Sequence, residues 1–486
     1  MILDAAIYDG FYTSRALPLS SQICVNWYVI ENKNSTGEIL SLSLLGTPGT
    51  TQLATSGVLN QINRGAWTFK GMPYFVNGTG LYRLEADLTT LTSLGTISGT
   101  ARVSIADNGT QMLILVPGST GYIFTIGPDN LATITDGDFD ASGDPVRVIF
   151  VDGYFLLTTN TKKFIVSALN DGTSYNALDF GSAEYNPDAI VAPFLHKSTV
   201  FIFGTETGEA FSNIGGSSFP FQRQQGFVLN KGLYAGNSIV ATQDSFMFIG
   251  NGKDESPAIW GFAGNTVQKI STEAIDSVLE AEAENGLLAD AFAYSYSQEG
   301  AFFVCFSLND TTLVFDTASL RWHERKSDIE INGVQTTTSW RANSLTQAYG
   351  KLLVGDSIDG RIAECDVDIL TEYTNIIERV ISGRPFQNQG LPFTVPFIEI
   401  TVESGVGNSS STDPKMRMSR SSNGKTWSGE RIRSVGKVGE YDHRVAWRRN
   451  GRSSRSEIYR FSYAENAKAV IRKVEATIQP MGVSLA

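Results

Sequence analysis

Residues 74–84, Tyr-Phe-Val-Asn-Gly-Thr-Gly-Leu-Tyr-Arg-Leu, hold the pattern that decides the fold. A short apolar run at 74–76 meets a turn at 77–80, and a second run follows at 81–84. Aromatic and β-branched residues favour strands, and Asn and Gly tolerate the positive φ angles of a tight turn. This stretch therefore predicts a β-hairpin.

The same hairpin pattern recurs along the chain. The first strands of seven such hairpins begin at residues 74, 112, 154, 200, 246, 302 and 352, in steps of 38 to 56 residues. That spacing is typical of propeller blades with four short strands. The alternative is a chain of unrelated β-meanders. We predict an all-β fold with a β-propeller of six or seven blades over residues 49–370, where the count depends on whether the chain ends supply a closing strand.

One segment, residues 271–286, interrupts the hairpin pattern and predicts a helix. Ser271 or Thr272 can cap its start, and Asn285-Gly286 can end it. Its apolar side chains fall on one face, at Ile275, Val278 and Leu279. The segment lies in the longest step between hairpins, so we expect a short helix inserted between two blades.

The sequence changes character from residue 371 onward. Segments 393–403, 416–421, 458–463 and 469–474 alternate in part between apolar and polar residues, as half-exposed strands do. We predict a C-terminal antiparallel β-sandwich-like domain, residues 371–486, packed on the propeller. Residues 1–48 are expected to pack on the propeller or on an adaptor protein.

Net charge changes sign along the chain. Residues 411–486 carry 16 Lys and Arg against 7 Asp and Glu, whereas residues 1–410 carry 22 against 43. Much of the positive charge lies in residues 444–455. A chain that separates its charge in this way is expected to bind a partner of complementary charge, either an anionic molecule or another copy of itself.

The basic run at residues 444–455 has three interpretations. It can contact DNA phosphates, pair with acidic surface on another protein, or form a solvated face. The acidic remainder of the chain would repel a duplex, and Trp and Arg are enriched at protein interfaces. We therefore predict a subunit or partner interface formed by Arg444, Trp447, Arg448, Arg449, Arg452 and Arg455.

The sequence shows no recognisable catalytic or metal-binding motif. Its 3 Cys are too few and too widely spaced for a disulfide framework, and they form no CxxC pair. Its 3 His lie in no spacing typical of a metal-ligand pair or a nucleophile and base pair. We expect that the protein is not an enzyme, with no catalytic residues, no metal and no cofactor.

The N-terminal residues and the apolar runs bear on membranes. The first residues, Met-Ile-Leu-Asp, lack the basic and apolar regions of a signal peptide. No apolar run approaches the ~18 residues that span a bilayer. We expect no membrane insertion by this chain.

Residues 441–452, Tyr-Asp-His-Arg-Val-Ala-Trp-Arg-Arg-Asn-Gly-Arg, follow the strand and turn at 418–427. Together these stretches closely resemble the C-terminal motif of the tail-hub or nozzle proteins of short-tailed bacteriophages, also called packaged-DNA stabilisation proteins. Residues 271–276 with the two strands that follow are similar to the corresponding part of that family, and residues 10–28 are so more weakly. The resemblance covers the whole chain.

This resemblance implies a structural virion protein. The family implies a propeller subunit in a six-copy ring beneath the portal and its head-to-tail adaptor, located in the virion tail and assembled in the cytoplasm of the host bacterium. Such a ring continues the DNA channel, retains packaged DNA until ejection, and carries tail fibres or tailspikes and a distal plug or needle. The acidic body is expected to let packaged DNA pass without sequence-specific binding, because it offers phosphates few cations.

The alternative function is a carbohydrate-binding or carbohydrate-cleaving propeller of a phage receptor-binding apparatus. Residues 421–427, Ser-Ser-Asn-Gly-Lys-Thr-Trp, are similar to the Asp-box turn of sialidase-type propellers, although one residue is missing and Asn replaces Asp. Four acidic residues close together could bind a cation or assist glycoside hydrolysis, although a loop of this kind is more often a solvated connection: Asp136, Asp138, Asp140 and Asp144.

Overall fold

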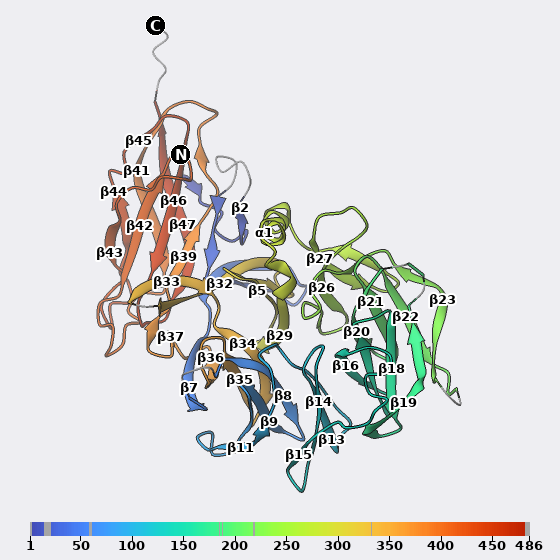
Figure 1. The fold of residues 1–486 in the computed structure, drawn as a ribbon. Coiled ribbons are helices and arrows are strands. Elements are labelled where there is room, and N and C mark those ends of the chain that lie inside the picture. The colour runs from blue at the N-terminus through green and yellow to red at the C-terminus, as the bar shows by residue number, and fades with distance from the viewer. Residues whose placement is uncertain are drawn as a thin grey trace.

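The computed structural model describes residues 2–13, 21–57, 61–183, 185–186, 188–216, 219–331 and 333–481. These ranges consist of β-strands with one α-helix and one short 3-10 helix. The strands form a ring of blades and a β-sandwich beside it (Figure 1). The predicted all-β class, with a propeller and a C-terminal sandwich, is confirmed.

The first four blades are four-stranded antiparallel sheets, each built from consecutive strands. Their strands are β8 (Asn63–Phe69), β9 (Met72–Asn77), β10 (Gly80–Leu84) and β11 (Leu91–Thr96); β12 (Ser104–Asp107), β13 (Gln111–Leu115), β14 (Gly121–Thr125) and β15 (Asn130–Thr133); β16 (Pro145–Val151), β17 (Tyr154–Thr159), β18 (Lys163–Ala168) and β19 (Asp171–Ser182); β20 (Ile190–His196), β21 (Thr199–Gly204), β22 (Gly208–Asn213) and β23 (Phe221–Leu229).

Three further blades bring the number within the described residues to seven. In the fifth blade the inner strand is split in two, and the seventh takes its outer strand from the N-terminal part of the chain. Their strands are β24 (Gly232–Leu233), β25 (Val240–Ala241), β26 (Phe246–Asn251), β27 (Ala258–Ala263) and β28 (Thr266–Lys269); β29 (Phe292–Gln298), β30 (Ala301–Ser307), β31 (Thr312–Asp316) and β32 (Arg321–Ile331); β34 (Ala342–Ala348), β35 (Lys351–Asp356), β36 (Arg361–Asp366) and β7 (Gly49–Thr55). A separate strand, β33 (Val334–Ser339), forms a hairpin with β32.

The strand β7 closes the propeller. It pairs antiparallel with β36, from Thr55 opposite Arg361 to Gly49 opposite Asp366. Its end is held by the backbone of Ser56, which donates to the Gly360 carbonyl at 2.9 Å. The chain end thus supplies the closing strand on which the blade count depended, and the count is seven.

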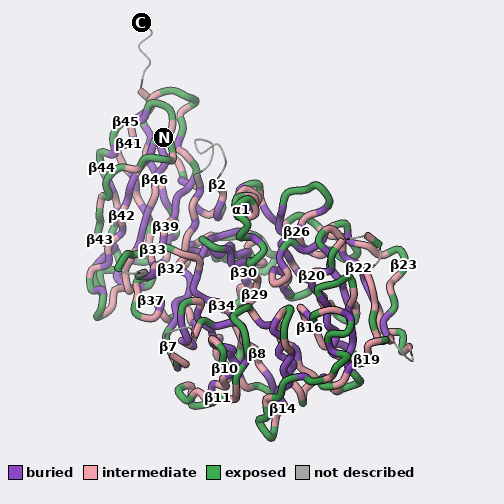
Figure 2. Tube along the Cα trace, in the orientation of Figure 1, coloured by how far each residue is buried: buried purple, intermediate pink, exposed green. Residues whose placement is uncertain are grey.

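The seven predicted hairpins form the middle two strands of the seven blades. The hairpin at residues 74–84 is β9 and β10, with Asn77 opposite Gly80 at the turn. These middle strands are buried on both faces, because each blade packs against the next (Figure 2). Burial on both faces explains why these strands are apolar at nearly every position.

The predicted helix is α1 (Glu273–Glu284), which lies between the fifth and sixth blades and is followed by the 3-10 helix η1 (Leu288–Asp290). Thr272 occupies the N-cap position without a side-chain hydrogen bond. The Ser271 hydroxyl instead donates to the Asp276 carboxylate at 2.6 Å. Ile275 and Leu279 are fully buried, so the apolar face of the helix covers the junction between the propeller and the sandwich.

The sandwich consists of two sheets, and both contain strands from the N-terminal part of the chain. One sheet contains β1 (Ile2–Asp4), β5 (Trp27–Lys33), β6 (Ile39–Gly46), β41 (Phe393–Val402), β44 (Val445–Arg448), β45 (Arg452–Ser453) and β47 (Val470–Pro480). The other contains β4 (Cys24–Val25), β39 (Arg379–Ser382), β40 (Phe386–Gln387), β42 (Lys415–Ser421), β43 (Arg431–Ser434) and β46 (Ser456–Tyr463). Three short pairings flank these sheets: β2 (Tyr12–Thr13) with β3 (Ser21–Gln22), β37 (Thr371–Glu372) with β38 (Asn375–Ile376), and β37 with β7.

The second sandwich sheet continues into the sixth blade. Strand β4 pairs in parallel with β32 of the propeller, at Val25 opposite Glu324, and antiparallel with β39 of the sandwich. The buried side chain of Asn26 reinforces this joint, because its amide donates to the carbonyls of Lys326 at 3.0 Å and Glu378 at 2.8 Å. The N-terminal segment, expected to pack on the propeller or an adaptor, therefore forms part of the sandwich and joins it to the propeller.

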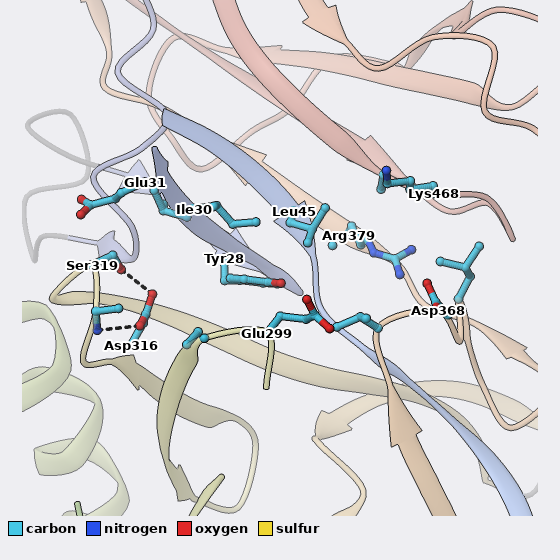
Figure 3. Close-up of a pocket in the computed structure, with 18 of the residues that line it drawn as sticks. Tyr28, Ile30, Glu31, Leu45, Glu299, Asp316, Ser319, Asp368, Arg379 and Lys468 are labelled. Atoms are coloured by element: carbon cyan, nitrogen blue, oxygen red, sulfur yellow. Dashed lines mark hydrogen bonds between the residues drawn. The ribbon is translucent and has the colours of Figure 1, made fainter. Parts of the chain in front are cut away.

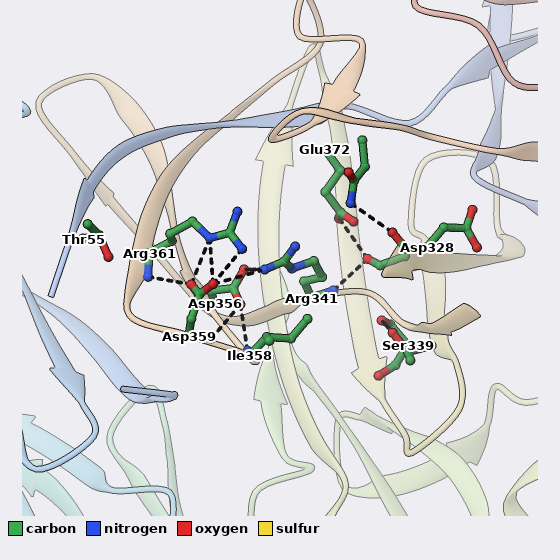
Figure 4. A network of polar contacts seen from close by, with 12 residues as sticks. Thr55, Asp328, Ser339, Arg341, Asp356, Ile358, Asp359, Arg361 and Glu372 are labelled. Atoms are coloured by element: carbon green, nitrogen blue, oxygen red, sulfur yellow. Dashed lines mark hydrogen bonds and ion pairs between the residues drawn. The ribbon is translucent and has the colours of Figure 1, made fainter. Parts of the chain in front are cut away.

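A buried polar network lies where the chain leaves the seventh blade (Figure 4). The Arg341 guanidinium pairs with Asp356 at 2.9 Å and lies 3.8 Å from Asp359. Nearby, the Ser327 hydroxyl donates to the Glu372 carboxylate at 2.9 Å. The network ties blade seven, the sixth-blade strand β32 and the start of the C-terminal part to one another.

Candidate partner interface

Strands β43 and β44 form the outer edges of the two sandwich sheets, on the side away from the propeller (Figure 1). Arginine side chains join the two edges. The Arg431 guanidinium donates to the Arg448 carbonyl at 2.7 Å, and the Arg433 Nε donates to the Ala446 carbonyl at 3.1 Å. These bonds use carbonyl groups that an uncovered edge strand would otherwise offer to another chain.

Five of the six predicted interface residues lie on β44 and β45 or in the segments that flank these two strands. We call them the basic edge: Arg444, Arg448, Arg449, Arg452 and Arg455, all exposed. Arg444 makes a bidentate pair with Glu399, at 2.7 and 2.6 Å, which lowers the pKa of that carboxyl. No carboxylate of a described residue lies within ion-pair distance of the other four, which leaves their charge available to a partner.

The sixth predicted residue, Trp447, is a core residue. Its side chain is 0% exposed, and its ring packs on Phe461 with centroids 5.5 Å apart. Its indole N–H donates to the Arg431 carbonyl at 2.8 Å. Because Val445 and Trp447 point inward along β44, the prediction that the Trp447 side chain contacts a partner is wrong.

Sequence reasoning missed an exposed apolar residue beside the basic edge. Ile432 lies on β43 between Arg431 and Arg433 and is 52% exposed. An exposed apolar residue among arginines has the composition that protein interfaces favour. The three-residue alternation Arg-Ile-Arg was visible in the sequence, but it was too short to indicate a strand edge.

The features that favoured a carbohydrate site have structural roles in this fold. In the turn 421–427, the Asn423 side-chain oxygen accepts the backbone N–H groups of Lys425 at 2.8 Å and Thr426 at 2.9 Å. In the acidic loop, the Asp136 carboxylate accepts the N–H groups of Tyr175 at 3.1 Å and Asp138 at 2.8 Å. Across the described ranges, no group of three or more His, Cys, Asp or Glu side chains is placed to hold a metal ion.

A cavity at the junction of propeller and sandwich has a volume of about 560 Å³ (Figure 3). One acidic side chain of its lining, Asp316, holds the turn that follows β31. The Asp316 carboxylate accepts the Ala318 N–H at 2.9 Å and the Ser319 hydroxyl at 2.7 Å. On the opposite wall Arg379 is buried, and burial lowers the pKa of its guanidinium to about 10.

Two further findings concern the environment of a histidine and the question of membrane-spanning helices. His323 is buried, and burial lowers the pKa of its imidazole to about 3, so it is neutral at physiological pH. In the part of the chain that the structure describes, no helix is both long and apolar enough to cross a bilayer.

The fold and the basic edge together define an all-β protein in which a seven-bladed propeller and a basic sandwich share one continuous sheet. Residues 5–370 match the family model described as Bacteriophage P22 Gp10, β-propeller. Residues 378–479 match the model described as Bacteriophage P22 Gp10, β-sandwich. The chain therefore belongs to the Gp10 family, and the resemblance predicted from residues 441–452 is confirmed.

Two kinds of similar protein accompany the family match. The tail hub protein gp10 of Salmonella phage P22 is 21% identical in an alignment of length 421 that covers 82% of this chain and 84% of that protein. Among solved structures, the WD40 β-propeller domain of Doa1 is 14% identical, with a TM-score of 0.37 over 65% of this chain and 97% of that chain. The N-terminal domain of Nup159 is 10% identical, with a TM-score of 0.40 over 71% of this chain and 99% of that chain. These structural likenesses are too weak to support an argument about function.

Proposed function

We propose that this chain is a structural virion protein, not an enzyme, that forms the tail hub or nozzle of a short-tailed bacteriophage. The observation that carries the proposal is the match to both parts of P22 Gp10, in order and over nearly the whole chain. The similarity to a phage tail hub protein over 82% of the chain supports the same role.

The hub is a ring of six copies in which the basic edge of one subunit contacts acidic surface on the next. The charge separation supports this arrangement, because residues 411–486 are net positive and the rest of the chain is net negative. The basic edge lies on the side away from the propeller of its own chain, so its free arginines meet a second copy more readily than their own acidic body (Figure 1). A head-to-tail contact of this kind closes into a ring when its rotation is a whole fraction of a turn.

In the virion tail this ring sits beneath the portal and its head-to-tail adaptor, continues the DNA channel, retains packaged DNA, and carries fibres or spikes and a distal plug. An acidic channel wall suits DNA passage, because phosphates that meet few cations are held weakly and slide. Assembly takes place in the host cytoplasm before the tail is complete.

A charge-reversal variant tests the role of the basic edge. Arg448→Glu with Arg449→Glu is expected to abolish ring formation while the subunit stays folded, because both side chains are exposed and unpaired. Negative-stain imaging and sedimentation of the purified chain, with and without the adaptor, measure the outcome.

The matched control reverses two exposed lysines in propeller turns, Lys70→Glu with Lys253→Glu, and should leave rings intact. Rings that persist in the arginine variant, together with altered DNA retention in virions, would show that the basic edge contacts DNA and not a neighbouring subunit.

A further inference from the structure

The central channel of the propeller contains two arginines without a counter-charge. The channel is lined by the inner strands of six blades and by the segment between β24 and β25 of the fifth, around the centre of the ring (Figure 1), and it has a volume of about 270 Å³. Its lining includes Arg102, before β12, and Arg147, on β16, and no Asp or Glu of the described residues. A protein whose first 410 residues are strongly acidic therefore places two uncompensated positive charges at the axis of its propeller.

Both arginines are half-buried in the channel, and the Nε of Arg147 is enclosed. Burial lowers the pKa of Arg102 to about 10, and the positive charge of Arg147 adds to this effect. Burial likewise lowers the pKa of Arg147 to about 10. Both groups remain charged at neutral pH, so the fold bears the cost of desolvating two like charges in one channel.

The donors of Arg147 are left for a ligand. One guanidinium nitrogen donates to the Val146 carbonyl at 2.9 Å, whereas the enclosed Nε has no hydrogen-bond partner. Gly236 lies against this guanidinium, where a Cβ would come within 3.3 Å of Nη2, so the absence of a side chain keeps the space open. A buried guanidinium donor without an acceptor costs free energy that a bound anion removes.

Arg102 is held in place beside the same channel. Its guanidinium donates to the Asn343 carbonyl at 2.8 Å and to the Asn343 side-chain oxygen at 2.5 Å. It also stacks on the Phe292 ring, 3.6 Å from the centroid. These contacts fix the orientation of the group and leave its charge unneutralised.

Arg64 shows how this fold satisfies a buried arginine that has only a structural role. Its guanidinium donates to four backbone carbonyls at 2.7 to 3.1 Å: those of Gly78, Ile97, Ser98 and Ala101. Arg147 has one such bond by comparison. The contrast indicates that Arg147 is not placed in the channel merely to bind backbone.

We propose that the central channel of the propeller binds a small inorganic oxyanion of the phosphate type between Arg102 and Arg147. Guanidinium groups match the oxygens of such anions in geometry and charge. A volume of about 270 Å³ accommodates such an anion with several waters, since a water occupies about 30 Å³ in the liquid, and it excludes a DNA duplex. The site is independent of the proposed hub ring, because it lies within one subunit.

Calorimetric titration of the full chain with inorganic phosphate, in phosphate-free buffer of constant ionic strength, tests the site. We expect saturable binding of one phosphate per chain, and at least tenfold weaker binding in Arg147→Gln. Arg455→Gln, an exposed arginine of the basic edge, is the matched control and should bind as the wild type does. Sulfate should compete with phosphate. If acetate competed as well, the ligand would be a carboxylate, and the proposal of an inorganic oxyanion would be overturned.

Thermal unfolding separates this role from a structural one. Without phosphate, Arg147→Gln should have a Tm equal to or above that of the wild type, because it removes a desolvated charge; with phosphate, only the wild type and Arg455→Gln should gain stability. Absence of saturable binding to the wild type, or equal binding to Arg147→Gln, would overturn the proposal. A lower Tm of Arg147→Gln in phosphate-free buffer would assign the side chain a structural role instead.

Discussion

Glu372 lies enclosed in the network at the exit from the seventh blade, facing Ser327 and the charges of Arg341, Arg325 and Asp356 (Figure 4). Burial raises the pKa of its carboxyl from 4.5 to about 7, although the Ser327 hydrogen bond and the arginines oppose the rise. The carboxyl therefore takes up a proton on folding over a range that includes mildly acidic pH.

The stability of the protein should depend on this carboxyl. Between pH 4.5 and about 7 the folded chain keeps a proton that the unfolded chain has lost, so the free energy of unfolding falls as pH rises through this window. Glu372→Gln removes this dependence and should gain on the order of 3 kcal/mol relative to wild type between pH 4.5 and pH 8. Urea unfolding across this pH range measures the difference, with the exposed Glu284→Gln as control; parallel profiles for wild type and Glu372→Gln would contradict the assignment.

Trp447 gives a second prediction about a single side chain. Trp447→Ala removes a fully buried ring from the sandwich core and should lower the free energy of unfolding by about 3–5 kcal/mol. Its exposed neighbour, Arg448→Ala, should change it by less than about 0.5 kcal/mol. Denaturant unfolding of both variants checks this, and a Trp447→Ala variant of normal stability that fails to assemble would restore the interface role.

For individual residues, the sequence predicted the charged ones better than the buried ones. The five arginines of the basic edge are exposed, as a run of charges predicts, whereas the period of two that places Val445 and Trp447 on one face was overlooked. The channel arginines, Arg102 and Arg147, carried no signal, because only closure of seven blades brings the two inner strands to one axis.

The closing strand β7 has a tight steric requirement at Gly49. A Cβ at Gly49 would meet the carbonyl oxygens of Ile369 and Thr371 below contact distance. We expect Gly49→Ala to shift β7 off β36 and to lower the free energy of unfolding by about 1–3 kcal/mol.

The control for this substitution is Gly137→Ala, because a Cβ at Gly137 meets no atom within 4 Å. Thermal and urea unfolding compare the two variants. If Gly49→Ala were as stable as Gly137→Ala, the close packing of β7 against the turn before β37 would be wrong.

The sequence predicted the middle hairpins of the blades because burial on both faces makes them continuously apolar. The outer strands, such as β11 and β15, are only half-buried and contain fewer apolar residues. Their sequences therefore did not predict them as separate strands. The helix α1 was predictable from its local caps and apolar face. The closing strand was not, because its partner β36 lies about 300 residues away along the chain.

The whole molecule is joined by one sheet that runs from the sixth blade through β4 into the sandwich. The sandwich also takes β5 and β6 from the N-terminal part of the chain, so the part of the chain that the sandwich model matches does not contain the complete set of sandwich strands. No local pattern predicts that N-terminal strands join the sandwich, since a two-residue strand such as β4 is recognised only by its pairing with neighbouring strands.

A fragment experiment follows from this connection. The fragment 371–486 should not fold alone, because it lacks β1, β4, β5 and β6. Joining residues 2–48, which carry these four strands, to it through a flexible linker should restore a cooperative unfolding transition, followed by circular dichroism. A cooperative transition in the fragment 371–486 without that addition would show that the N-terminal strands are dispensable.

The hub role is tested most directly by imaging the purified full chain with its head-to-tail adaptor in the electron microscope. We expect rings of six copies seated on the adaptor, in which the basic edge of each sandwich lies against the propeller of the next copy. Copies that stay single, both alone and with the adaptor, would contradict it.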